Sequence, residues 1–185
     1  MKVRPLPLAF VISVVAFATL ATADPAPNTA AGIAAWEATY RVLQHPRCRN
    51  CHPAGDAPLH GDDGHPHSMN VSRTSAKSGL ACTTCHRSKN VDAPHAPPGV
   101  PGWRMPDAEM PLVFEGRSSH DLCEQLKDPK RNGHKTLPEL AHHVGHDPFV
   151  LWGWNPGPGR TTPPTPHAEL VHDVETWGRA GAPCP

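Results

Sequence analysis

Two five-residue segments hold the residues best suited to chemistry. The segment Cys48-Arg49-Asn50-Cys51-His52 recurs 34 residues later as Cys82-Thr83-Thr84-Cys85-His86. The C-x-x-C-H pattern is typical of c-type haem attachment, because two neighbouring thiols add to the vinyl groups of one porphyrin and the adjoining histidine binds the iron. Two copies predict two covalently bound haems c. The expected attachment residues are Cys48, Cys51, Cys82 and Cys85, and the expected proximal iron ligands are His52 and His86.

A zinc site and a redox-active pair are two other interpretations of the cysteine pairs. A C-x-x-C pair is also half of a zinc site, but the 30 residues between Cys51 and Cys82 exceed the usual spacing of zinc ribbons. Zinc ribbons also need no histidine after each pair. A thioredoxin-like redox pair would lie within a β-α-β unit, and neither motif is surrounded by such a pattern. Haem attachment explains more of the pattern than either alternative.

The sixth ligand of each iron decides what such a protein does. Two strong ligands make an electron carrier, whereas an open position makes a gas-binding or peroxide-handling site. We expect the distal ligands to be His67, midway between the motifs, and His146, at the end of a helix beside a proline. Their closest competitors are Met69, His95, Met105 and His142. The other candidates are His45, His60, His65, His120, His134, His143, His167, His172 and Met110, of which His167 and His172 are expected to be solvated.

The first residues have the pattern of an export signal. Lys2 and Arg4 precede an apolar run from Leu8 to Leu20, and residues 21–23 form a small-x-small cleavage site. We predict a signal peptide at 1–23 and a single dihaem cytochrome c domain at 24–185, located in the periplasm. An uncleaved anchor is the alternative, but the run is short for a membrane span and prolines follow it. No membrane span is expected after cleavage.

Composition predicts a fold that is mostly irregular with a few short α-helices. The chain has 24 Pro and 15 Gly but only 10 aromatic residues, so its side chains alone bury little apolar surface. We therefore expect a fold of the multihaem cytochrome c type, organised around two covalent haems that supply much of the core. Without haem, a disordered chain is the alternative.

The balance of acidic and basic residues argues against a nucleic-acid partner. The 17 Lys and Arg residues balance 17 Asp and Glu residues. Removal of residues 1–23 takes away Lys2 and Arg4, which leaves 15 basic against 17 acidic residues and a net charge of −2. A nucleic-acid-binding surface would need a basic stripe, so no nucleic acid is expected.

Sequence periodicity and capping residues predict four helices. The first runs from Thr29 to about Gln44, and the second begins after Ser118 or Ser119 and ends at Asp128. A capping box at residues 136–139 opens the third, which closes at residues 147–148, and the fourth has Thr165 as its cap. Between them, residues 52–79 and 149–166 are expected to be loops. Residues 90–111, with six prolines, are expected to form an extended segment wrapped on a haem edge.

Two cysteines remain after the motifs have taken four. Cys123 and Cys184 form an even pair in an exported chain, so a disulfide between them is expected. Two free thiols are the alternative.

Several phrases around the motifs resemble a known group of proteins. The phrases are HPRCRNCHPAGDAPL, MNV after His67, QLKDPKRNG, HDPFVLWGWNPGPGR and the terminal AGAPCP. They are similar to small exported dihaem c-type cytochromes of bacteria that are often labelled as a subunit of isoquinoline 1-oxidoreductase, a molybdenum hydroxylase. The resemblance implies redox partner proteins, with a molybdenum hydroxylase as electron donor and a respiratory-chain acceptor. The chain has no Cys set for an iron-sulfur cluster and no room for a molybdopterin domain, so it is not the hydroxylase itself.

Together these patterns predict an electron-transfer protein rather than an enzyme. The alternative is a small haem enzyme of the peroxidase or nitrogen-oxide reductase type with one open iron site, and a haem-based sensor is a third possibility. No acid or base stands out beside a plausible open iron.

Overall fold

The computed structural model describes Met1, residues 29–93 and residues 95–185. The predicted signal peptide therefore lies, apart from Met1, outside the described residues. Helices make up about 42 % of the described structure, and most of the rest is irregular. Within the described residues, no helix has the length and apolarity that a membrane crossing requires.

One end of the molecule is a small helical body. Helix α1 (Thr29–Leu43) packs along α6 (His167–Arg179), and α4 (Leu137–His146) packs against the same α6. Helix α1 forms because it is rich in alanine and places Trp36 and Leu43 on one buried face. Gly32 allows close packing at its start, because a Cβ there would lie 2.6 Å from the Cβ of Ala180.

Local capping sets the limits of the helices between α1 and α6. Helix α3 (Ser119–Lys127) begins where the Ser118 side chain accepts a hydrogen bond from Asp121 N. Helix α4 begins with the predicted capping box, in which Thr136 and Glu139 each accept from the other's backbone N–H. The predicted beginnings of both helices are confirmed.

Three predictions for the C-terminal third are wrong. The stretch after α4 is not entirely loop, because Asp147 caps a further short helix, α5 (Pro148–Trp152), through the N–H of Phe149. Helix α6 begins one residue later than expected, with Pro166 at the N-cap and no side-chain cap from Thr165. His167 is not simply solvated, since its Nε2 lies 2.9 Å from Val144 O.

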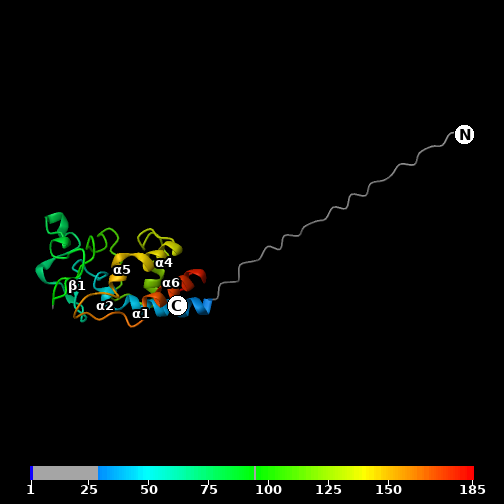
Figure 1. Ribbon diagram of the computed structural model, residues 1–185. Helices are drawn as coiled ribbons and strands as arrows, with labels where there is room; N and C mark the ends of the chain where they lie inside the picture. The colour runs from blue at the N-terminus through cyan, green and yellow to red at the C-terminus, as the bar shows by residue number, and fades with distance from the viewer. Residues whose placement is uncertain (2–28, 94) are drawn as a thin grey trace.

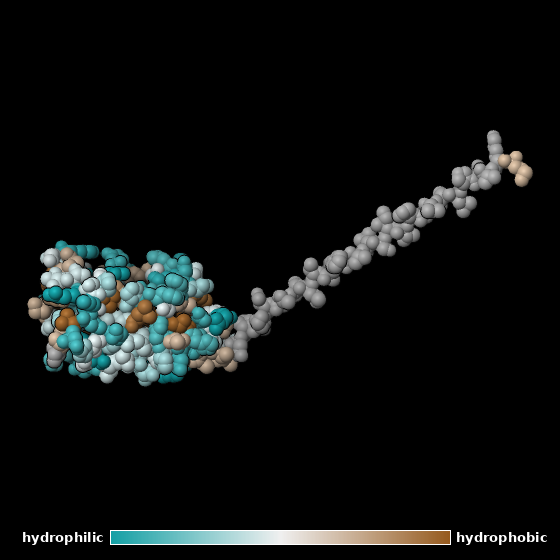
Figure 2. All heavy atoms as spheres, in the orientation of Figure 1, coloured by the Kyte–Doolittle hydropathy of each residue, from teal (hydrophilic) through white to brown (hydrophobic). Residues whose placement is uncertain are grey.

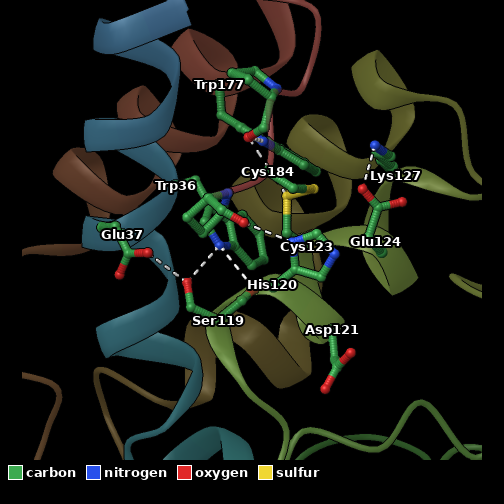
Figure 3. Close-up of a disulfide and its surroundings, with 12 residues drawn as sticks. Trp36, Glu37, Ser119, His120, Asp121, Cys123, Glu124, Lys127, Trp177 and Cys184 are labelled. Atoms are coloured by element: carbon green, nitrogen blue, oxygen red, sulfur yellow. Dashed lines mark hydrogen bonds and ion pairs between the residues drawn. A yellow bond between two sulfur atoms is a disulfide. The ribbon is translucent and has the colours of Figure 1, made fainter.

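A disulfide closes the helical body. Cys123 on α3 and Cys184 in the C-terminal tail are bonded, as the sequence predicted, and Figure 3 shows the bond beside Trp36 and Trp177. These two indole rings pack with their centres 4.9 Å apart. Trp36 Nε1 donates to Ser119, so the buried indole is also hydrogen-bonded. The disulfide thus fixes the tail against the largest aromatic pair of the core.

The other end of the molecule carries little regular structure. The remaining elements are α2 (Pro46–Arg49), a two-stranded antiparallel hairpin of β1 (Leu59–His60) and β2 (His65–Pro66), and the 3₁₀ turns η1 (Ser68–Asn70), η2 (Ser75–Ser78) and η3 (Cys82–Thr84). Figure 1 shows these green and teal segments gathered at one end, opposite α6 and the C-terminus. In Figure 2, separate hydrophobic patches lie between polar side chains across the middle of the visible face. Both cysteine motifs belong to the irregular end.

Candidate functional site

The two C-x-x-C-H motifs fold into the same kind of turn. In the first, His52 N donates to Cys48 O at 3.2 Å, and in the second His86 N donates to Cys82 O at 3.0 Å. In both, the second cysteine's N–H donates to the first cysteine's carbonyl, at 3.2 Å. Residues three and four apart in a helical turn share a face. Each motif therefore presents its two thiols and its imidazole on one side of a single turn.

A strap at residues 112–115 holds the first motif histidine. His52 Nδ1 lies 2.7 Å from Leu112 O, and its ring stacks on Phe114 with centres 3.9 Å apart. The N–H of Phe114 donates to His52 O at 2.9 Å. Leu112 has a left-handed backbone, with φ of 48°, a conformation that costs a non-glycine residue about 1–3 kcal/mol and persists only where the surroundings impose it.

A second strap holds the second motif histidine in the same way. His86 Nδ1 lies 2.8 Å from Pro98 O, and its ring stacks on Trp103 with centres 4.5 Å apart and planes 4° apart. Gly99 lets this strap approach, since a Cβ there would lie 2.1 Å from Lys89 O. Asn90 Oδ1 accepts from Gly99 N and from Trp152 Nε1. The proline-rich segment is therefore pinned at the point where it meets the motif.

These contacts fix the protonation of both imidazoles. A backbone carbonyl only accepts hydrogen bonds, so Nδ1 must carry the proton in each ring, and Nε2 keeps its lone pair. Burial lowers the pKa of His52 to about 4, against which the hydrogen bond to Leu112 acts only partly. Burial also lowers the pKa of His86. Both rings are neutral at pH 7 and have the tautomer of a metal-ligating histidine whose Nδ1–H is held by a carbonyl.

The four motif thiols are not paired with one another. Cys48, Cys51, Cys82 and Cys85 are all free of disulfides. Burial raises the pKa of Cys48 to about 12, and burial raises that of Cys51 to about 11. A protonated, buried thiol suits addition across a vinyl group, which yields an uncharged thioether. These residues therefore fit haem attachment, and an exposed redox thiolate would need the opposite environment.

A cavity of about 280 Å³ lies against the second motif. Cys82, Cys85 and His86 line it together with Cys51 of the first motif. Its other walls include the Trp103 ring and the cationic side chains Arg47 and Arg160. Cys48 does not line this cavity. It packs instead against buried apolar side chains of the helical body. The two motifs are thus neighbours, with one cavity between their cysteines.

His67 lines the same cavity as His86. Their ring centres are 6.0 Å apart, and the Nδ1 of His67 lies against Ser68 O, which leaves its Nε2 free. Two imidazoles that bind one metal ion on opposite sides through bonds of about 2 Å have ring centres roughly 6 to 6.5 Å apart. Met69, His95 and Met105 also line the cavity. The side chain of Met69 is 74 % exposed.

The α4 histidines differ in the side of the helix they occupy. His142 and His146 are both exposed and stack on each other, with ring centres 4.3 Å apart. His143 is half-buried, next to the core residues Leu140 and Val144 on the helix surface, and its Nδ1 lies 3.4 Å from Asp147 Oδ2. It is also close enough to His52 to lower the pKa of that ring. His143 therefore lies on the buried side of α4, whereas His146 lies on its exposed side.

Four residues of the site were not anticipated as contacts. Phe114, Leu112 and Pro98 contact the motif histidines, and Asn90 fixes the second strap through Gly99. Nothing in their local sequence distinguishes them from ordinary loop residues. They could be found only from tertiary contacts. Trp103 was expected near a haem edge, and its position on His86 makes it a support for the ring.

No known protein family, curated protein or solved structure matches this chain. Among the described residues, no group of three or more His, Cys, Asp and Glu side chains could hold a metal ion. Haem iron needs only one or two protein ligands, because the porphyrin supplies the others.

Proposed function

We propose that this protein carries single electrons through two covalently attached c-type haems. The observation that carries the proposal is the duplicated support of the motif histidines. Each ring is held by one backbone carbonyl on Nδ1 and one aromatic ring on its face. Such an arrangement orients a neutral imidazole and leaves Nε2 for iron.

The chain's residues have separate tasks in this proposal. Cys48 and Cys51 would hold one haem and Cys82 and Cys85 the other, each through two thioether bonds. The bound haems would supply the one-electron chemistry of their irons. The straps at residues 98–103 and 112–115 orient His86 and His52.

The sixth ligand of the second haem is assigned to His67. Its support is the 6.0 Å separation from His86 and the free Nε2 on each ring. For the first haem, α4 is the source of the ligand, and the geometry favours His143 over the sequence-based choice, His146. With two imidazoles on each iron, both haems would be low-spin electron carriers of low potential.

The proposed partners and cellular location rest on the sequence patterns alone. The proposal includes export to the periplasm, a molybdenum hydroxylase as donor and a respiratory-chain acceptor, as the resemblance implies. Purified protein from a haem-ligating host should retain two haems per chain in denaturant, as measured by the pyridine haemochrome absorbance and the mass of the chain. A count of one or none would refute the proposal. Two haems with one high-spin iron that binds carbon monoxide would favour the haem-enzyme alternative.

A further inference from the structure

The cavity beside the second motif is unusually rich in cations. Arg47 and Arg160 both line it, and the charge of each acts on the other. Arg104 is a third cation on the same wall. The described carboxylate that faces this pair is Asp62, which contacts Arg47 and also accepts from Thr161 N at 3.1 Å. One shared carboxylate leaves positive charge in a partly enclosed, largely apolar space.

Among the described arginines that line the cavity, Arg47 is the one with a buried nitrogen that makes no hydrogen bond. Its side chain is only 3 % exposed, whereas that of Asp62 is 38 % exposed. Arg47 Nη2 donates to Gly61 O at 3.0 Å and to Asp62. Its Nε is buried and has no partner among the described residues. A buried donor on a charged group without an acceptor costs several kcal/mol relative to water, so an acceptor is expected there.

The comparison with Arg73 shows what a structural arginine looks like in this fold. Its side chain is 1 % exposed, and its terminal nitrogens donate to the carbonyls of Pro53, Gly55 and Pro106. These bonds tie the loop between the motifs together. Its Nε also makes no hydrogen bond, but it lies 3.6 Å from Asp56 Oδ1. Arg47 has one such carbonyl, and the Trp152 ring lies beneath its guanidinium at 5.8 Å. The position of Arg47 is therefore fixed, while part of its hydrogen-bonding capacity is unused.

We propose that Arg47 binds a propionate carboxylate of the haem attached at the second motif, with Arg160 as the second cation of the same site. This inference rests on the proposed function, since it requires a haem in the cavity. Guanidinium groups bind carboxylates through two parallel N–H donors, and Nε with a terminal nitrogen forms such a pair. Arg47 directly precedes Cys48 on α2. The helix that carries an attachment cysteine of the first haem would therefore also bind a propionate of the second haem.

Resonance Raman spectroscopy tests this assignment, because the propionate bending band shifts with the hydrogen bonds that the carboxylate accepts. In Arg47→Gln, we expect the band of one haem to move to lower frequency and the band of the other to stay. The midpoint potential of the same haem should fall, since a buried positive charge stabilises the reduced iron. Arg179→Gln is the matched control, because Arg179 lies on α6 with its side chain 63 % exposed.

Two further variants keep the test informative if Arg47→Gln fails to fold. Arg47→Lys keeps the charge but loses the paired donors, so the band should shift in the same direction by less. Asp62→Asn removes the competing carboxylate, so the band should shift in the opposite direction.

Unchanged propionate bands in all folded variants that carry two haems would overturn the inference and leave the proposed function intact. A wild-type protein without covalent haem would overturn the proposed function itself.

Discussion

Replacing His67 by alanine tests how the second iron is coordinated. His67 and His86 line the same cavity with ring centres 6.0 Å apart, close to the separation that one shared metal ion imposes. Removing one ring leaves that iron with a single protein ligand and leaves the first haem untouched. One of the two haems, and hence half of the total haem, should therefore change from low spin to high spin.

The measurement is magnetic circular dichroism of the oxidised protein, followed by titration of the reduced protein with carbon monoxide. We expect about one equivalent of carbon monoxide bound per chain in His67→Ala and little in the wild type. His67→Met should stay low-spin and raise the potential of that haem, since a thioether ligand favours the reduced iron.

His60→Ala is the matched control for His67→Ala. The His60 ring lies 5.7 Å from that of His67 and lines the same cavity. Its loss should leave both haems low-spin. If His67→Ala remained fully low-spin and bound no carbon monoxide, His67 would not be the ligand, and the reasoning from ring separation would be wrong.

Three other predictions follow from the structure. His143→Ala should create a high-spin signal at the first haem and His146→Ala should not, by the same dichroism measurement; the reverse result would return the assignment to His146. Alanine at both Cys123 and Cys184 should lower the free energy of unfolding by about 4 kcal/mol, because the bond closes a loop with a sequence separation of 61 residues; urea unfolding checks this, and a loss within error of zero would contradict it. In protein prepared without haem, whose His52 binds no iron, acidification should lower the free energy of unfolding, because burial lowers the pKa of His52 to about 4. The stabilisation is complete above the unfolded-state pKa of about 6.5 and is lost as the pH falls towards 4. Urea midpoints at a series of pH values would show this decline, and a flat profile would count against it.

The sequence was informative where structure depends on neighbouring residues. The capping box of Thr136 and Glu139 and the apolar face of α1 are local patterns, and the structure has both. The disulfide followed from counting cysteines. Helix α5 was missed because its five residues include Pro148 and lie in a stretch rich in Trp, Pro and Gly, where periodicity is too short to detect.

The candidate site depends largely on contacts between residues distant in sequence, which local patterns do not predict. The motifs could be named from spacing, but the straps could not, because Phe114 and Pro98 reach the histidines through contacts across 62 and 12 residues. His143 could be placed on the buried side of α4 from helical geometry alone. It follows Leu140 by three residues and precedes Val144, whereas His146 lies on the outer face with His142.

The contact of Gly32 with Ala180 and Pro183 has a practical consequence. It brings the start of α1 next to the C-terminal tail, at the end of the molecule away from the segments around β1 (Figure 1). A tether or an affinity tag joined at either position would leave the motif end pointing outward. On a surface to which the helical body is attached, the motif end would therefore remain accessible to redox partners in solution.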